Sequence, residues 1–140
     1  MTHRTWLKSD IETLSEWFKN ETTARRLGGM LPLDKFYDYA SAQENKRNLM
    51  FFDDEKAVGH SDAEVDGDTV SVSVLVNPKC RGQGYGRQIL QQVIRLYAGK
   101  RLYAGIEEDN TVCIKLFSSC GFTLTGKDKD GFLEYILETL

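Results

Sequence analysis

The sequence predicts an α+β domain with a mixed, mostly antiparallel sheet and helices on both faces. Valine occupies every second position from Val70 to Val76, which is the period of a strand with one buried face. Asp66-Gly67 lies just before this strand and is a two-residue hairpin signal, so the preceding strand runs antiparallel to it. After it come a glycine-rich turn, helically spaced apolar residues and another strand, an order that implies one parallel pair.

The N-terminal part is predicted to contain a short strand, at Thr2 to Leu7, and two helical stretches. Ser9-Asp10-Ile11-Glu12 matches a capping box, with serine as N-cap and glutamate three residues later. The helical pattern continues, with a break near Asn20, as far as Gly28-Gly29. We expect these glycines to end it in the left-handed C-cap conformation. Pro32 then opens the next helix.

The remaining chain is predicted as strands joined by turns, with two more helices. The strands are expected at Asn48 to Phe52, Ala57 to Val65, Val70 to Val76, Leu102 to Glu107, Phe122 to Thr125 and Phe132 to Leu137. One helix follows the glycine-rich turn, and Asp109 or Asn110 caps the other. Counting back from the hairpin places Val65 opposite Asp68 and His60 opposite Ser73.

Bulk composition narrows the classes of function. A chain of 140 residues is the length of one domain, here residues 1–140. A net charge of −3 indicates neither a nucleic-acid partner nor an anionic membrane surface. No apolar run approaches the roughly 20 residues of a membrane span, and the start lacks a signal-peptide core. The three cysteines are odd in number and lack metal spacing, which favours reduced thiols, a cytoplasmic location and no bound metal.

A glycine-rich turn separates the valine strand from the helix that follows it. Asn77 and Pro78 stop the strand, because proline cannot donate to a sheet ladder. A strand, a glycine-rich turn and a helix in this order aim backbone N–H groups at an anion, so we expect cofactor phosphates here. No Gly-Lys-Ser/Thr of a Walker loop follows, and Arg87 replaces the third glycine of a dinucleotide fingerprint. The turn reads Arg81-Gly82-Gln83-Gly84-Tyr85-Gly86.

A second motif follows the next strand and consists of Asn110, Cys113, Ile114, Leu116, Phe117, Gly121 and Phe122. In this order, the two motifs resemble those of the GNAT superfamily of acyl-CoA-dependent N-acetyltransferases. The family patterns are Q/R-x-x-G-x-G/A, after a strand often ending V-x-P, and then N-x-x-A-I-x-L-Y-x-x-x-G-F. The resemblance covers nearly the whole chain in element order. It departs at Phe117, where the family often has tyrosine, and at Cys113, which replaces an inward-facing alanine.

The resemblance implies a GNAT-like fold with acetyl-CoA as co-substrate, bound against the valine strand. Backbone groups of Val74, Leu75 and Val76 would pair with the pantetheine arm, and Asn110 would contact the pantetheine or its sulfur end. Backbone amides and positive side chains of one loop would hold the pyrophosphate at the helix N-terminus. This loop comprises Arg81, Gly82, Gln83, Gly84, Tyr85, Gly86 and Arg87.

The implied reaction is direct attack of a primary amine on the thioester in a ternary complex. It needs a backbone N–H near Val76 for the developing oxyanion, and a base. The candidate bases are His60, which titrates in the useful range, and Glu107, at the end of the strand beside the cofactor. A lone strand histidine is more often structural. Phe117 cannot donate a proton, but a thiol pKa of about 8.5 lets the thiolate leave unaided. Arg25-Arg26 is interpreted as a solvated helix face.

An N-acetyltransferase is therefore the leading interpretation. An acyl-CoA-binding module without catalysis is the alternative, favoured by Phe117, and a nucleotide-binding regulator would need a different loop. The acceptor is left open between a small-molecule amine, including an aminoglycoside, and a protein N-terminus. A homodimer is likewise left open.

Overall fold

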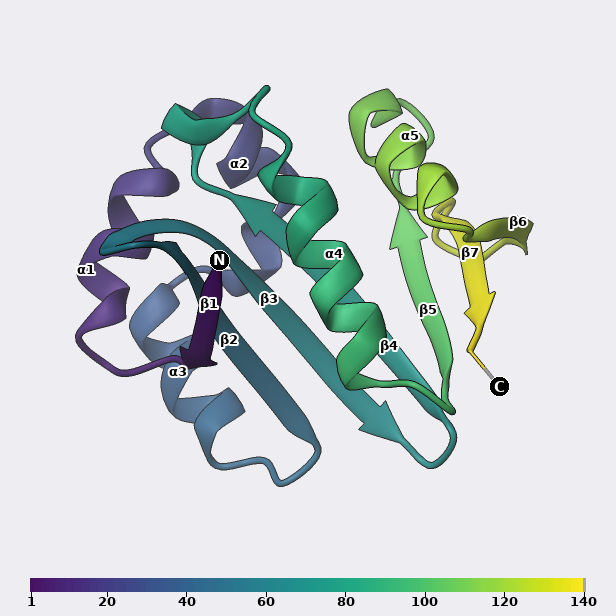
Figure 1. Ribbon diagram of the computed structural model, residues 1–140, viewed down its shortest axis with the longest axis horizontal. Coiled ribbons are helices and arrows are strands. Elements are labelled where there is room, and N and C mark those ends of the chain that lie inside the picture. The colour runs from purple at the N-terminus through teal and green to yellow at the C-terminus, as the bar shows by residue number, and fades with distance from the viewer. Residues whose placement is uncertain (140) are drawn as a thin grey trace.

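A computed structural model describes residues 1–139 and confirms the predicted fold class (Figure 1). The sheet has seven strands in the order β1-β2-β3-β4-β5-β7-β6, and only the β4–β5 pair is parallel. The strands are β1 (Thr2–Thr5), β2 (Lys46–Asp53), β3 (Lys56–Asp66), β4 (Thr69–Val76), β5 (Arg101–Ile106), β6 (Thr123–Lys127) and β7 (Leu133–Glu138). The helices are α1 (Asp10–Trp17), α2 (Glu21–Arg26), α3 (Leu33–Ser41), α4 (Tyr85–Leu96) and α5 (Thr111–Ser119). Within residues 1–139, we find no helix that is both long and apolar enough to cross a membrane.

The sheet buries a separate core on each face. Helices α4 and α5 cover the face turned toward the viewer in Figure 1, and α1 and α3 cover the other. The alternation in β4 assigns its side chains to these two cores. Val70 and Val72 belong to the core that includes Ile89 of α4, whereas Leu75 belongs to the core that includes Leu14 of α1. The prediction of a single buried face was therefore wrong for the end of β4, because α1 and α3 cover the face that carries Leu75.

The β3–β4 hairpin is confirmed, but its predicted register is not. His60 lies opposite Leu75, so the prediction of Ser73 as its partner was wrong by two residues, as was that of Asp68 opposite Val65. The turn lies one residue later than predicted, with the hairpin glycine at its first position and a φ of 60°. Moving a two-residue turn by one residue moves the register by two.

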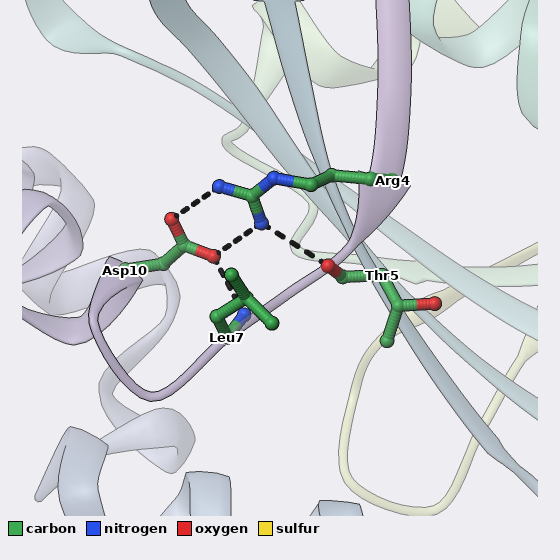
Figure 2. Close-up of polar contacts among 4 residues, drawn as sticks. All are labelled: Arg4, Thr5, Leu7 and Asp10. Carbon is green, nitrogen blue, oxygen red and sulfur yellow. Dashed lines mark hydrogen bonds and ion pairs between the residues drawn. The ribbon is translucent and has the colours of Figure 1, made fainter.

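Two of the predicted helix ends were wrong. Ser9 has helical backbone angles and makes no side-chain cap hydrogen bond. Asp10 supplies the anchor instead, because its carboxylate accepts the Leu7 N–H at 2.6 Å and two Arg4 guanidinium bonds at 2.7 and 2.9 Å (Figure 2). This charge-assisted, bidentate pair ties β1 to the start of α1. The glycines expected as a left-handed C-cap form the short 3₁₀ turn Gly28–Met30 and lack positive φ.

The predicted break near Asn20 is confirmed, and a separate short helix begins after it. The Asn20 side-chain oxygen accepts the Thr23 backbone N–H at 3.1 Å, so Asn20 is the N-cap of α2. Pro32 is the N-cap of α3, close to its predicted place. The cap at Asn20 matters for the site, because it places α2 beside the ends of β4 and β5.

Candidate active site

Strands β4 and β5 pair at one end only and then separate. Figure 1 shows them diverging, with α4 over β4 and α5 on the side of β5. We call this divergence the splay. It begins after the last of three register pairs, which are Thr69 with Arg101, Val70 with Leu102 and Ser71 with Tyr103.

Backbone groups of β4 face the splay at alternate residues. The Asn77 N–H donates to the Val58 carbonyl at 2.8 Å, which marks a hydrogen-bonded pair of the antiparallel β3–β4 ladder. Such pairs alternate, so Leu75 directs its backbone toward β3, and Val74 and Val76 direct theirs toward the splay. The register of the described strands gives Val74 and Val76 no partner on β5. They therefore offer N–H and C=O groups to an extended ligand.

The glycine-rich loop lies where β4 ends and α4 begins. Gly82 and Gly84 have φ values of 78° and 83°, and Gly84 is the N-cap of α4. A Cβ added to either would meet no atom within 4 Å, so both adjoin open space. Unpaired N–H groups and the helix dipole make this end attractive to an anion. Gly86 instead marks a close approach, because a Cβ there would lie 3.4 Å from side-chain atoms of Leu116 and Val76.

The two arginines of the loop are tied to neighbouring elements. Arg81 donates to the Thr23 hydroxyl of α2 at 2.8 Å. Arg87 donates to the Ser119 hydroxyl at the end of α5 at 2.9 Å. Both residues are exposed overall, so their positive charges stay at the surface beside the helix N-terminus.

The other loop residues divide between anchored and exposed positions. Tyr85 donates its hydroxyl to Asp53, and this hydrogen bond to a carboxylate raises the pKa of Tyr85. Cys80 is buried at the base of the loop, whereas Gln83 is exposed. The loop is thus fixed at its base and open along its backbone.

The second motif caps and packs α5. The Asn110 side-chain oxygen accepts the Cys113 N–H at 3.3 Å, which makes Asn110 the N-cap. Phe117 is 2% exposed and packs edge-on against Phe122, with ring centroids 5.0 Å apart. Burial raises the pKa of the Cys113 thiol to about 11. Neither Cys113 nor Phe117 therefore presents a reactive group at neutral pH.

His60 lies in the core between the sheet and α1. Its ring is 1% exposed and lies 5.1 Å from the Trp6 ring, and its Nε2 is 2.9 Å from the Asn48 side-chain oxygen. Burial lowers the pKa of His60 to about 3, so the imidazole is neutral across the physiological range. In the folded chain, solvent does not reach it.

Glu107 lies just after β5, beside the splay. Arg26 of α2 contacts its carboxylate at 3.2 Å and that of Asp109 at 2.7 Å, both through Nη1. The Arg26 side chain is only 15% exposed, so its assignment to a solvated helix face was wrong, although Arg25 is exposed as expected. Sequence reasoning missed these contacts because the partners are far apart in the chain, with 83 positions between Arg26 and Asp109, and no local periodicity relates them.

An acidic hollow adjoins Glu107 on the side of the β6–β7 turn. Its volume is about 240 Å³. Its lining consists of Glu107, Glu108, Asp109, Asp130, Gly131 and Phe132. Four of these six residues carry carboxylates, and two cations pair with three of them: Arg26 with Glu107 and Asp109, and Lys127 with Glu108. The carboxylates outnumber these cations, so the hollow favours cationic over anionic molecules.

Together, the open strand edge at the splay and the loop at the helix N-terminus suit an extended, phosphate-bearing acyl carrier of the kind that acyl-transfer enzymes use. Residues 11–122 match the Acetyltransferase (GNAT) family. An uncharacterised N-acetyltransferase of Bacillus subtilis (strain 168), YfmK, is 36% identical over 133 residues, covering 91% of this chain and 90% of the relative. The chain belongs to the GNAT family, as the sequence motifs predicted. It is an acetyl-CoA-dependent N-acetyltransferase with acetyl-CoA as co-substrate.

Solved structures show the same fold. Spermidine N-acetyltransferase from Vibrio cholerae, in complex with CoA and spermine, superposes with a TM-score of 0.85 at 12% identity. The similarity covers 99% of this chain and 95% of that one. Aminoglycoside acetyltransferase AAC(6')-Ib, in complex with coenzyme A, gives a TM-score of 0.83 at 18% identity and covers 99% of this chain and 94% of that one.

Proposed function

We propose that this enzyme transfers the acetyl group of acetyl-CoA to a primary amine of a small molecule, by direct attack in a ternary complex. The observation that carries the proposal is the splay, where Val74 and Val76 turn unpaired backbone groups toward a gap that ends at the loop around Gly84. Acetyl-CoA supplies the reactive thioester when bound. The residues present fit it, because an extended strand edge suits the pantetheine amides and the helix N-terminus suits the phosphates.

Direct attack is favoured over a covalent acetyl-enzyme. A cysteine nucleophile acts as its thiolate, and the raised pKa of Cys113, about 11, keeps this partly buried thiol protonated. The backbone N–H of Val76 faces the splay and is positioned to donate to the carbonyl oxygen as negative charge develops there. The carbonyl oxygen of the acetyl group would thus accept a hydrogen bond from the backbone of β4.

We assign the base role to Glu107. It is 38% exposed, lies at the end of β5 beside the splay, and is held by Arg26. The ammonium proton has to be removed before the nitrogen can attack, and a carboxylate can accept it directly or through water. His60 was an equal candidate from sequence, but it is buried with its pKa at about 3, so we give it a structural role.

The leaving thiolate does not need a proton donor at position 117. Phe117 is buried against Phe122 and has no proton to donate. A thiol pKa of about 8.5 means that the thiolate can leave as the anion near neutral pH and then take a proton from water.

The proposed acceptor class is a small cationic amine. The acidic hollow beside Glu107 supports it, because its four carboxylates outnumber the two cations, Arg26 and Lys127, that pair with them. Two proteins of the same fold are named for such acceptors, spermidine and aminoglycosides. A protein N-terminus is the second acceptor class. The three free cysteines fit a reducing compartment, so we retain the cytoplasm as the proposed location.

A thiol-release assay tests this proposal. The full chain is incubated with acetyl-CoA and a panel of polyamines, aminoglycosides, amino acids and a peptide with a free N-terminus. We expect release of free thiol with at least one small amine, and formation of the acetylated amine in equal amount by mass spectrometry. Turnover with the peptide alone would contradict the acceptor class, and acetyl-CoA binding without turnover of any amine would contradict the proposed reaction.

A further inference from the structure

Helix α2 is attached to both sides of the splay. Near its middle, the Thr23 hydroxyl accepts a hydrogen bond from Arg81, in the loop that follows β4. At its C-terminal end, Arg26 contacts Glu107 and Asp109, in the segment that follows β5. Because β4 and β5 no longer pair at this level, α2 bridges the two strand ends through side chains.

Arg26 makes its contacts from a fixed position in the fold, not as a freely moving surface side chain. The Arg26 side chain is 15% exposed, and its Nε is buried without a hydrogen-bond partner in the part of the chain that the structure describes. Asn20 and Thr23 fix the helix that carries it. Its carboxylate partners are more open to solvent, since the side chains of Glu107 and Asp109 are 38% and 70% exposed. Ion pairs of this kind contribute little to stability, and leaving the buried Nε–H unpaired costs free energy. The contact between Arg26 and the two carboxylates is therefore better explained by the geometry that it imposes than by a gain in stability.

We propose that Arg26 is a positioning residue for acetyl transfer, which acts by holding the Glu107 carboxylate at the mouth of the splay. This inference rests on the proposed function, which makes Glu107 the base. A base acts efficiently only within hydrogen-bond reach of the ammonium proton. Without Arg26, the Glu107 side chain would sample several rotamers.

Substitutions at two adjacent arginines separate this role from a general loss of charge. Arg26→Met keeps the apolar stem and removes the ion pairs, and exposed Arg25→Met is the matched control. We expect Arg26→Met to lower kcat/KM for the amine by about 10- to 100-fold, the range that misplacement of a catalytic group produces. The KM for acetyl-CoA should stay within about twofold, because phosphates and pantetheine bind elsewhere. Arg26→Lys should recover most of the activity, since one nitrogen, Nη1, makes both contacts.

A double-mutant cycle with Glu107→Gln provides the decisive comparison. If Arg26 acts through Glu107, then Arg26→Met should add almost nothing to the loss that Glu107→Gln already causes. Additive losses would overturn the inference, and so would an Arg26→Met variant as active as Arg25→Met. A wild-type chain that turns over no amine would overturn the proposed function and this inference together. An active wild type with an additive cycle would overturn the inference alone.

Discussion

Ser71 on β4 and Tyr103 on β5 are the last residues that these two strands pair, and beyond them the strands separate. The backbone of Val74 and Val76 then faces the splay, and the loop at its far end carries Gly84 at a φ of 83°. A parallel pair that ends after three register positions leaves strand edges without their usual partners. The site that we propose for acetyl-CoA lies where this pairing ends.

Gly84→Ala should weaken acetyl-CoA binding by at least about tenfold, because its Cβ would enter the open space where we place the phosphates. A side chain at positive φ also costs about 1–2 kcal/mol of stability. Gly99→Ala is the matched control, since Gly99 has a φ of 88°, an equally open surrounding and a position beyond the opposite end of α4. Calorimetry on both folded variants is the measurement. Equal acetyl-CoA affinity in the two would contradict phosphate binding at this loop.

His60 should make the fold less stable as the pH falls below about 6.5. Its pKa in the folded state is about 3, against 6.5 as the ordinary value, so the unfolded chain binds the proton first. Between these values, the free energy of unfolding should decrease by roughly 1.4 kcal/mol per pH unit. Urea unfolding at several pH values measures this slope, which His60→Gln should remove.

The second histidine of the chain, His3, is exposed and gives the control for this slope. His3→Gln should leave it unchanged.

Asp10 affects the stability of the fold in a lower pH range than His60 does. Burial alone would raise its pKa, but hydrogen bonds from Arg4 and the Leu7 N–H outweigh burial and lower it. The stability that Asp10 contributes is therefore lost only as the pH falls below about 3.8. A slope that survives in His60→Gln would contradict the buried, neutral histidine.

The sequence predicted those features that depend on local pattern. The valine alternation, the hairpin and the strand–helix–strand order were enough for the fold class, and the two motifs were enough for the family. The cap at Ser9 was misjudged because the Arg4 guanidinium, from a different element, gives Asp10 the stronger interaction. The role of Arg26 was missed for a related reason, since its partners come together only through the tertiary fold. Whether His60 is a base or a core residue depends on burial, which a single strand position does not reveal.

Phe117→Leu should keep most of the turnover. The Phe117 ring is buried against Phe122 and lacks a proton to donate, so a smaller apolar side chain loses packing and no chemistry. Phe117→Ala should cost about 3–5 kcal/mol of stability through the cavity that it leaves. Thermal unfolding and kcat, measured on the same samples, separate the two effects. A folded Phe117→Leu variant that binds acetyl-CoA but has lost turnover would show that the ring takes part in the reaction.

Cys113→Ala should retain kcat within a few-fold, because the partly buried thiol has a pKa of about 11 and takes no part in direct attack. Intact-mass spectrometry of the wild type with acetyl-CoA, before amine is added, checks the same point. We expect no acetylated enzyme. A mass gain of one acetyl group that disappears in Cys113→Ala would indicate a covalent route.

Amide hydrogen exchange along β4, resolved by residue with NMR, is the most direct test of acetyl-CoA binding in the splay. The N–H groups of Val74 and Val76 face the splay, whereas that of Leu75 already bonds to β3. Addition of acetyl-CoA should therefore slow exchange at Val74 and Val76 by at least about tenfold and leave Leu75 nearly unchanged. Unchanged exchange at Val74 and Val76 with saturating acetyl-CoA would contradict pantetheine binding along β4.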